Sequence, residues 1–233
     1  MAHYLANSLD WLVVTTTTTM NDHGIPTADA IASGFPHFVL PRIDEPPARV
    51  DIDMAQEMQN ENAASRPSTR GGGIHGHAEM VVSPARYAAE YSNVAYIWEV
   101  NPGEGPVFPA NITAASARTL KNDYASSARV FQDQTQTHTA LKNQLYRQYP
   151  TEYWTGLIET GIGIATVSLL EMYTHLYTNF GQITDGDLEE SRAGITGQYD
   201  FATRPMQQFL HMVRKAQQLH GNAIPPIPIT DNE

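Results

Sequence analysis

The chain has 233 residues, of which 41% are hydrophobic, and its 14 basic and 25 acidic side chains give a formal net charge of −11. A net field of that sign repels nucleic acid backbones, so any RNA contact needs a local group of basic residues. The absence of cysteine excludes disulfides, thiol catalysis and cysteine-based zinc sites, and no stretch reaches the ~20 apolar residues of a membrane span.

Residues 1–73 are interrupted by proline and glycine, as in FPHFVLPRIDEPP (35–47) and RPSTRGGG (66–73). Only Val50, Met54 and Met58 keep a helical spacing of four. Alone, such a segment buries too little apolar surface to offset its ordering entropy. The sequence therefore predicts a long extended N-terminal arm, ordered by a neighbouring subunit. The apolar side chains expected to contact that neighbour are Trp11, Leu12, Val13, Val14, Phe35, Phe38 and Leu40.

Residues 74–110 are predicted to form a small strand–helix–strand segment. HAEMVV (77–82) and AYIWEV (95–100) are typical of short strands. Between them, Ser83 and Pro84 suit the N-cap and the first position of a helix.

Residues 111–221 follow a helical pattern. A stripe that advances by three, four or seven predicts one long helix from Thr113 to just before Pro150. The stripe consists of Leu120, Tyr124, Ala128, Phe131, His138, Leu141 and Leu145. A short helix is expected over 152–158.

Two further helices have clear start signals. Ser168 and Glu171 form a capping box, and Gly181 is expected to end that helix in the left-handed conformation. The next helix is expected after Thr184, because the acidic residues of TDGDLEESR complement the positive end of a helix dipole. That stretch lacks the ligand register of a calcium-binding loop, so we interpret it as a helix start.

A last helix is expected over 203–220, followed by an extended proline-rich tail over 222–233. Its inward side chains are predicted to be Met206, Phe209, Leu210, Val213, Ala216 and Leu219.

One candidate metal site lies in GGGIHGHAEM. On a strand, His75, His77 and Glu79 would share one face and could hold zinc or iron with open positions. This leaves a small metalloenzyme as an alternative. No second ligand motif accompanies it, so we favour a structural turn and predict no catalytic, cofactor or metal site.

A second alternative is an RNA-binding module. Basic residues recur along the predicted long helix and could contact RNA, although such residues more often form a solvated face. They are Arg118, Lys121, Arg129, Lys142 and Arg147.

The stretch LLEMYTHLYTNFGQITDGDLEESR (169–192) combines a helix ending in His-Leu with Phe-Gly, Ile-Thr and an Asp-Leu pair. ALKNQLYRQYPTEYW, FPHFVLPRI, STRGGGIHGH and SPARYAAEY precede it in the chain. In this order the stretches resemble the Gag-like polyprotein of copia-type LTR retrotransposons, which usually has Tyr in place of Phe180. The matching residues are His175, Leu176, Gly181, Ile183, Thr184, Asp187 and Leu188.

The resemblance implies a helical capsid-like domain that self-assembles without enzymatic activity. We therefore expect a mainly α protein with a small β element and a long arm. Exchange of arms between neighbours would form virus-like particles or filaments. We expect a location in the cytoplasm or within a virus-like particle, no membrane contact, and the chain itself as partner. Element RNA is expected to bind only through a C-terminal segment that this sequence does not contain.

Overall fold

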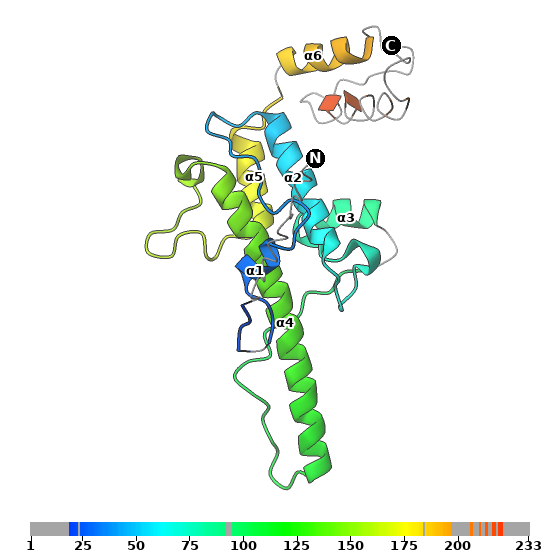
Figure 1. Ribbon diagram of the computed structural model, residues 1–233, viewed down its shortest axis with the longest axis vertical. Coiled ribbons are helices and arrows are strands. Elements are labelled where there is room, and N and C mark those ends of the chain that lie inside the picture. The colour runs from blue at the N-terminus through cyan, green and yellow to red at the C-terminus, as the bar shows by residue number, and fades with distance from the viewer. Residues whose placement is uncertain are drawn as a thin grey trace, which may run out of the picture. The chain divides into compact units, whose positions relative to one another are not determined.

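The computed structural model describes residues 19–22, 24–91, 95–183 and 185–196, together with 206, 210, 213, 216, 217, 219 and 220. Within these residues the protein is mainly helical, as predicted, and forms no named strand. The named elements are α1 (Ala28–Ala32), α2 (Arg49–Ser65), η1 (Gly73–His75), η2 (Ala78–Met80), α3 (Pro84–Glu90), α4 (Ala114–Gln148), η3 (Thr151–Trp154), α5 (Leu169–Asn179) and α6 (Asp185–Thr196) (Figure 1).

The chain divides into two compact units. Unit 1 contains the described residues of Met1–Phe38, Glu61–Met80 and Pro84–Gln144. Unit 2 contains those of Val39–Asn60, Val81–Ser83 and Leu145–Glu233. Each unit draws on separate stretches, so the units do not coincide with the consecutive segments 1–73, 74–110 and 111–221 that the sequence suggested.

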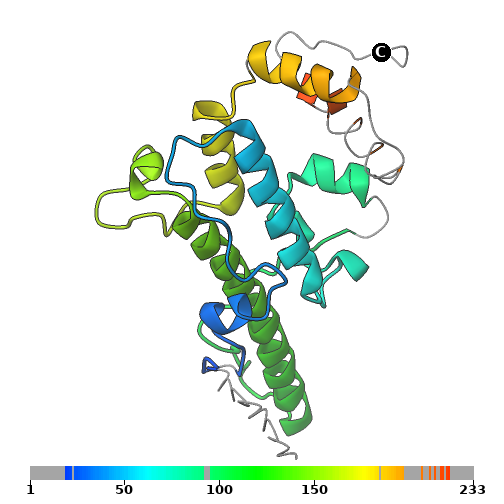
Figure 2. The same ribbon diagram turned by 45° about the horizontal axis from the view of Figure 1, so that its top comes forward.

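Unit 1 is built around α4. Figure 2 shows α1 against this helix, where the Gln136 side chain accepts a hydrogen bond from the Ala28 backbone N–H at 3.0 Å. The same view shows the loop before α4 running back along its first turns. The apolar core of this unit includes Ile25, Ile31, Phe35, Ala63, Met80, Tyr87, Tyr96, Ala128, Ala140 and Leu141.

Unit 2 contains the first turns of α2 beside α5 (Figure 1). The Tyr173 hydroxyl donates to Gln59 at 3.0 Å, and the Tyr177 hydroxyl donates to Asp53 at 2.8 Å. Polar groups therefore join the two helices alongside apolar contacts. The buried apolar residues of this unit include Leu40, Ile52, Ala55, Val82, Leu145, Tyr149, Trp154, Leu169, Met172, Tyr173 and Leu176.

The long helix predicted from Thr113 is confirmed as α4, which has 35 residues. The Thr113 side chain caps it by accepting the Ser116 backbone N–H at 3.2 Å. Burial along the helix is uneven. Leu120 remains 38% exposed, whereas Leu141 and Leu145 are fully buried. The apolar stripe thus faces a core from Ala128 onward, and not over the first turns of the helix.

The capping box that begins α5 is also confirmed. Ser168 accepts the Glu171 N–H at 3.1 Å, and Glu171 accepts the Ser168 N–H at 2.7 Å. The left-handed terminator predicted at Gly181 is wrong, since this residue does not have a positive φ. Glycine suits the site because a Cβ there would lie 2.9 Å from the Tyr177 Cα.

The predicted strands are not formed. Instead of extending, residues 77–82 begin with the 3₁₀ turn η2, because Gly76 packs against the end of α2 and the His77 N–H donates to the Ala63 carbonyl at 3.0 Å. Residues 95–100 are extended but unpaired as a strand. The helix predicted after Ser83 is confirmed as α3.

The expected extended arm is corrected over 49–65, because Arg49–Ser65 forms the 17-residue helix α2. Its buried face carries Ile52, Ala55 and Gln59, whereas Val50 is 65% exposed. The helical spacing of Val50, Met54 and Met58 marked the wrong face of this helix, because the buried face includes the polar side chains of Gln59 and Asn62.

The remaining helix predictions are confirmed only in part. The short helix expected over 152–158 is limited to η3, and the acidic stretch is helical as α6, with Thr184 outside the described residues. The described residues between 206 and 220 are helical, and Met206 and Leu210 are exposed rather than inward. No helix in the described part of the chain is both long and apolar enough to cross a membrane.

Candidate functional site

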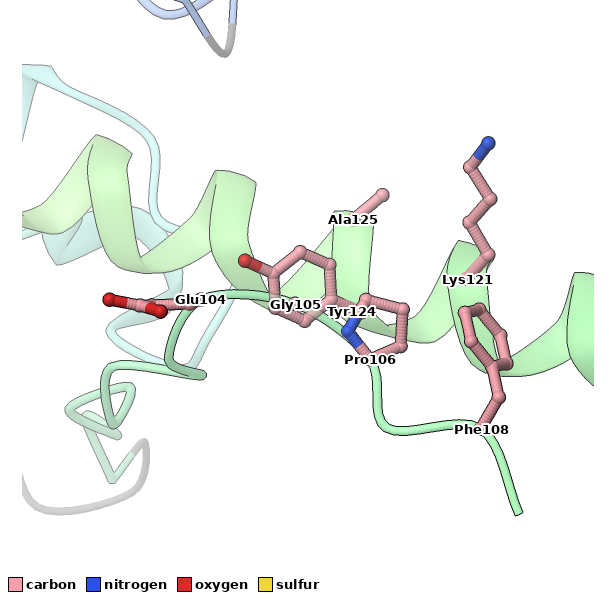
Figure 3. A pocket seen from close by; sticks show the side chains of 7 residues that line it. All are labelled: Glu104, Gly105, Pro106, Phe108, Lys121, Tyr124 and Ala125. Carbon is pink, nitrogen blue, oxygen red and sulfur yellow. The ribbon is translucent and has the colours of Figure 1, made fainter. Parts of the chain in front are cut away.

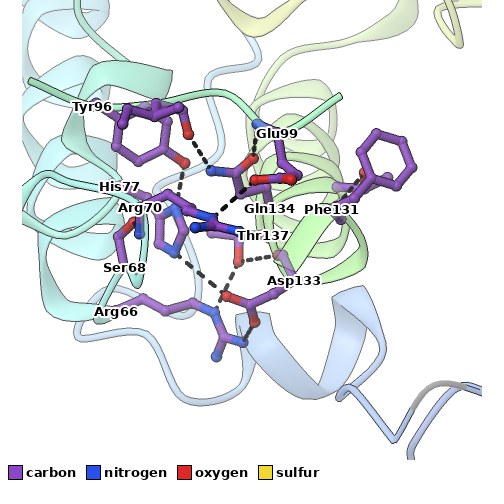
Figure 4. A network of polar contacts seen from close by, with 12 residues as sticks. Arg66, Ser68, Arg70, His77, Tyr96, Glu99, Phe131, Asp133, Gln134 and Thr137 are labelled. Atoms are coloured by element: carbon purple, nitrogen blue, oxygen red, sulfur yellow. Dashed lines mark hydrogen bonds and ion pairs between the residues drawn. The ribbon is translucent and has the colours of Figure 1, made fainter. Parts of the chain in front are cut away.

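A polar network joins three segments of unit 1 (Figure 4). Arg66 forms an ion pair with Asp133, and its Nε donates to the Thr137 hydroxyl at 2.8 Å. His77 is only 1% exposed. Its Nδ1 lies 2.7 Å from the Tyr96 hydroxyl, and its Nε2 lies 3.7 Å from an Asp133 carboxylate oxygen. Asp133 thus binds one end of the segment that runs from Arg66 to His77 and lies near the other end, beyond hydrogen-bond distance.

The Gln134 side chain holds segment 95–100 against α4. Its Nε2 donates to the Ile97 carbonyl and its Oε1 accepts the Glu99 N–H, both at 2.8 Å. The Ile97 N–H donates to the Arg70 carbonyl at 2.8 Å, and Arg70 Nε lies 2.9 Å from a Glu99 carboxylate oxygen. A side-chain amide and a loop carbonyl therefore replace the neighbouring strand that this segment lacks.

The protonation behaviour of this network favours a structural role. Burial lowers the pKa of His77 to about 4, against the raising effect of Asp133. Burial also raises the pKa of Tyr96. His77 is therefore neutral and Tyr96 protonated near pH 7, and neither side chain is suited to exchange a proton there.

The candidate metal ligands do not share a face, because the predicted strand is a 3₁₀ turn. The His75 ring lies 4.1 Å from the Tyr91 ring, whereas His77 points into the network. Burial raises the pKa of Glu79, which is partly offset by a hydrogen bond with Trp98. Across the described residues, no group of three His, Asp or Glu side chains could hold a metal ion.

Exposed apolar side chains occur at both ends of the segment from Ile97 to Phe108. Val100 and Val107 are 82% and 88% exposed, and Trp98 and Phe108 are about half exposed. We name this surface the apolar strip; it consists of Ile97, Trp98, Val100, Val107 and Phe108.

Beside the strip, the loop 104–108 and the first half of α4 line an open groove of about 450 Å³ (Figure 3). Its lining residues are Glu104, Gly105, Pro106, Phe108, Lys121, Tyr124 and Ala125. The Tyr124 hydroxyl donates to the Gly103 carbonyl at 2.8 Å and so fixes the loop against the helix.

The proposed RNA-contacting residues are only partly brought together. Arg118, Lys121 and Arg129 are exposed on the first half of α4. No ion pair links these three to an acidic group in the described part of the chain. Lys142 is only 8% exposed, so it is not available as a surface cation. Arg147 is exposed but belongs to unit 2.

The predicted arm residues have different surroundings. Trp11, Leu12, Val13 and Val14 lie outside the described residues. Phe35 and Leu40 are each 6% exposed, so the chain buries them itself, and Phe38 is 64% exposed.

The backbone between these arm residues is held by amides. Asn62 accepts the His37 N–H at 2.8 Å and donates to the His37 carbonyl at 2.9 Å, while Gln144 donates to the Phe38 carbonyl at 2.9 Å. Asn62 and Gln144, which we name the polar clamp, thus bind this backbone within one subunit. The sequence had predicted an apolar contact with a neighbour there.

Sequence reasoning missed the polar network. Its signal was the run QDQTQTH (132–138), in which polar residues occupy every position of a helix that must still bury one face. Gln134 and Thr137 are that buried face. Comparison of the chain with protein-family models, with curated proteins and with solved structures finds no match.

Proposed function

We propose that this chain is a self-assembling structural subunit, of the capsid-like kind that its resemblance to copia-type Gag implies. The observation that carries the proposal is the apolar strip. Large exposed apolar surfaces mark interaction sites in soluble proteins, and the strip gathers five exposed apolar side chains into one short segment of the chain. Burying the strip would contribute about 25 cal/mol per Å² of apolar area before the costs of association are subtracted.

The charge of the chain favours a second copy as the partner of the strip. The chain carries 25 acidic and 14 basic side chains, so its net charge is negative. The helix face beside the strip instead carries the exposed and locally unpaired Arg118, Lys121 and Arg129. A contact between this basic face and an acidic part of another copy is electrostatically complementary. Because two different surfaces meet, such a contact generates rings or filaments.

In this proposal the apolar strip contacts the neighbouring copy in place of Phe35 and Leu40. Phe35 and Leu40 are held within their own subunit, so they do not serve the contact. Exchange of the first residues of the chain, including Trp11 to Val14, remains part of the proposal.

The proposal is tested with Val100→Ser/Val107→Ser, because these side chains make few contacts within the subunit. The matched control is Val39→Ser/Ile74→Ser, which removes two similarly exposed apolar side chains outside the strip. Negative-stain microscopy should show regular particles or filaments for the wild type and the control, and fewer or none for the strip variant. Equal assembly of both variants would show that the strip is not the contact.

A second candidate function is binding of single-stranded RNA at the same helix face. Lys121, Tyr124 and Phe108 lie together at the groove, and basic and aromatic side chains in combination bind single strands through phosphate contacts and base stacking. This alternative predicts RNA affinity that falls steeply with salt, which fluorescence anisotropy with a labelled oligonucleotide would measure.

A further inference from the structure

The groove beside the apolar strip has the form of a site for an extended peptide. Figure 3 shows the side chains of Tyr124, Pro106 and Phe108 following one another along it, with Lys121 towards the Phe108 end and Glu104 at the other. Two aromatic rings with a proline ring between them form a ridged surface rather than one deep cavity. Such a surface suits a ligand that repeats a small apolar group at short intervals.

The groove is formed before any ligand arrives. The hydrogen bond of 2.8 Å from Tyr124 to the Gly103 carbonyl ties the loop to α4. Phe108 is 48% exposed, so its ring remains available to a ligand. Little conformational entropy would be lost on binding, which favours even a small interface.

Proline-rich segments are the ligands that this geometry fits. A polyproline II helix has three residues per turn and no internal hydrogen bonds, and aromatic-lined grooves bind it with little ordering cost. An aromatic ring covers the flat face of a proline, and the next notch accepts a branched apolar side chain.

The chain contains one such segment outside its described residues. IPPIPI (224–229) alternates isoleucine with Pro225, Pro226 and Pro228, and Asp231 and Glu233 follow it. At roughly 3.1 Å per residue, Asp231 would lie about 6 Å beyond the last isoleucine in an extended chain. Lys121 stands at one end of the groove, and Arg118 precedes it by one helical turn. The charges of the segment and of the groove are therefore complementary.

We infer that this groove binds residues 224–229 of a second copy, with Asp231 and Glu233 beside Lys121 and Arg118. This inference rests on the proposed self-assembly and adds a second contact between copies. Because the groove lies in unit 1 and the segment at the other end of the sequence, the contact joins unlike surfaces and can propagate from copy to copy.

The test is titration of a labelled peptide, AIPPIPITDNE, into the full chain. The receptor carries Pro225→Ala, Pro226→Ala and Pro228→Ala, so that its own tail does not compete. In this background, Phe108→Ala should weaken binding at least about tenfold, as expected for loss of one well-packed aromatic contact. Ile74→Ala is the control, since this apolar side chain is 89% exposed and belongs to neither the groove nor the apolar strip; it should bind as the receptor does.

Two peptide variants complete the test. Replacing the three prolines by alanine should abolish binding, and replacing Asp231 and Glu233 by amides should weaken it. No binding, equal binding by the alanine peptide, or equal effects of Phe108→Ala and Ile74→Ala would overturn the inference. Displacement of the bound peptide by a single-stranded oligonucleotide is compatible with it, whereas a groove that binds the oligonucleotide and not the peptide contradicts it.

The assembly state of the wild-type chain, measured by sedimentation, separates this inference from the proposed function. Assembly without peptide binding overturns only the role of the groove. Peptide binding by a chain that stays monomeric overturns the proposed self-assembly and the second-copy role, and leaves the groove as a peptide site.

Discussion

The hydroxyl of Tyr96 lies 2.7 Å from Nδ1 of the buried His77 ring, and this pair connects the segment 95–100 to the loop after α2. When Tyr96 donates to Nδ1, the ring hydrogen of the neutral imidazole lies on Nε2, which is 3.7 Å from an Asp133 carboxylate oxygen and too far for a hydrogen bond. Protonation of His77 would place a hydrogen on Nδ1 as well and so prevent the donation from Tyr96.

The stability of the protein should therefore fall as the pH drops through the slightly acidic range. The pKa of His77 is lowered from 6.5 to about 4 in the folded chain, chiefly by burial. The unfolded chain binds the proton first, so the contribution of His77 is complete above pH 6.5 and is lost as the pH falls towards 4. Between pH 7 and pH 5 the loss is about 2 kcal/mol.

His77→Asn should reduce this dependence, which urea unfolding at the two pH values would measure. Burial lowers the pKa of His138 in the same direction, so the variant retains part of the slope. An unchanged slope in His77→Asn would contradict the buried neutral imidazole.

Asn62→Leu should destabilise the protein by about 1–3 kcal/mol, the cost of leaving a buried donor unpaired. The substitution removes the acceptor of the His37 N–H. Asn122→Leu, at an exposed position of α4, is the control and should change the free energy of unfolding little. Equal effects of the two substitutions in urea unfolding would mean that the clamp adds no stability.

Gly76→Ala should be among the most damaging single changes in the chain. Gly76 has φ +52°, and a Cβ there would lie 2.1 Å from the Arg66 carbonyl oxygen. Gly76 combines φ +52° with ψ −116°, which lies outside the left-handed helical region and costs a residue with a side chain about 1–3 kcal/mol. A backbone clash that no side-chain movement relieves adds to this cost. Gly24→Ala is the control for a positive φ without a clash, because Gly24 has φ +68° and open space at the Cβ position. The difference between their melting temperatures measures the clash together with the φ/ψ combination of Gly76, and equal melting temperatures would exclude both.

Ser168→Ala should cost about 1 kcal/mol through loss of the α5 cap. Ser168→Thr keeps an accepting hydroxyl and should restore most of that stability. Thr166→Ala, at an exposed position just before the helix, should leave the free energy of unfolding unchanged. A Ser168→Ala variant as stable as the wild type would show that the Glu171 half of the capping box suffices.

Local signals in the sequence predicted the helices well. Thr113 and Ser168 accept backbone N–H groups as cap residues do, and Ser83-Pro84 marks the start of α3. Each of these signals depends on a few neighbouring residues, so no knowledge of tertiary contacts is needed to read it.

The failures came from buried polar groups. Val50 and Met54 keep helical spacing but are exposed, whereas Gln59 and Asn62 are fully buried because they bond to Tyr173 and to the His37 backbone. An argument from periodicity assigns amide side chains to the surface, because the groups that form hydrogen bonds with them when buried lie far away in the sequence. For the same reason the network around Asp133 and the groove at Tyr124 could not be predicted.

The most direct test of self-assembly is the mass distribution of the full-length wild-type chain, followed by sedimentation velocity over a range of concentrations. The proposal predicts that material of 25.8 kDa gives way to discrete larger species as the concentration rises. These species should be reduced by Val100→Ser/Val107→Ser and not by Val39→Ser/Ile74→Ser. A single species of 25.8 kDa at every concentration would contradict the proposal that the chain is a structural subunit.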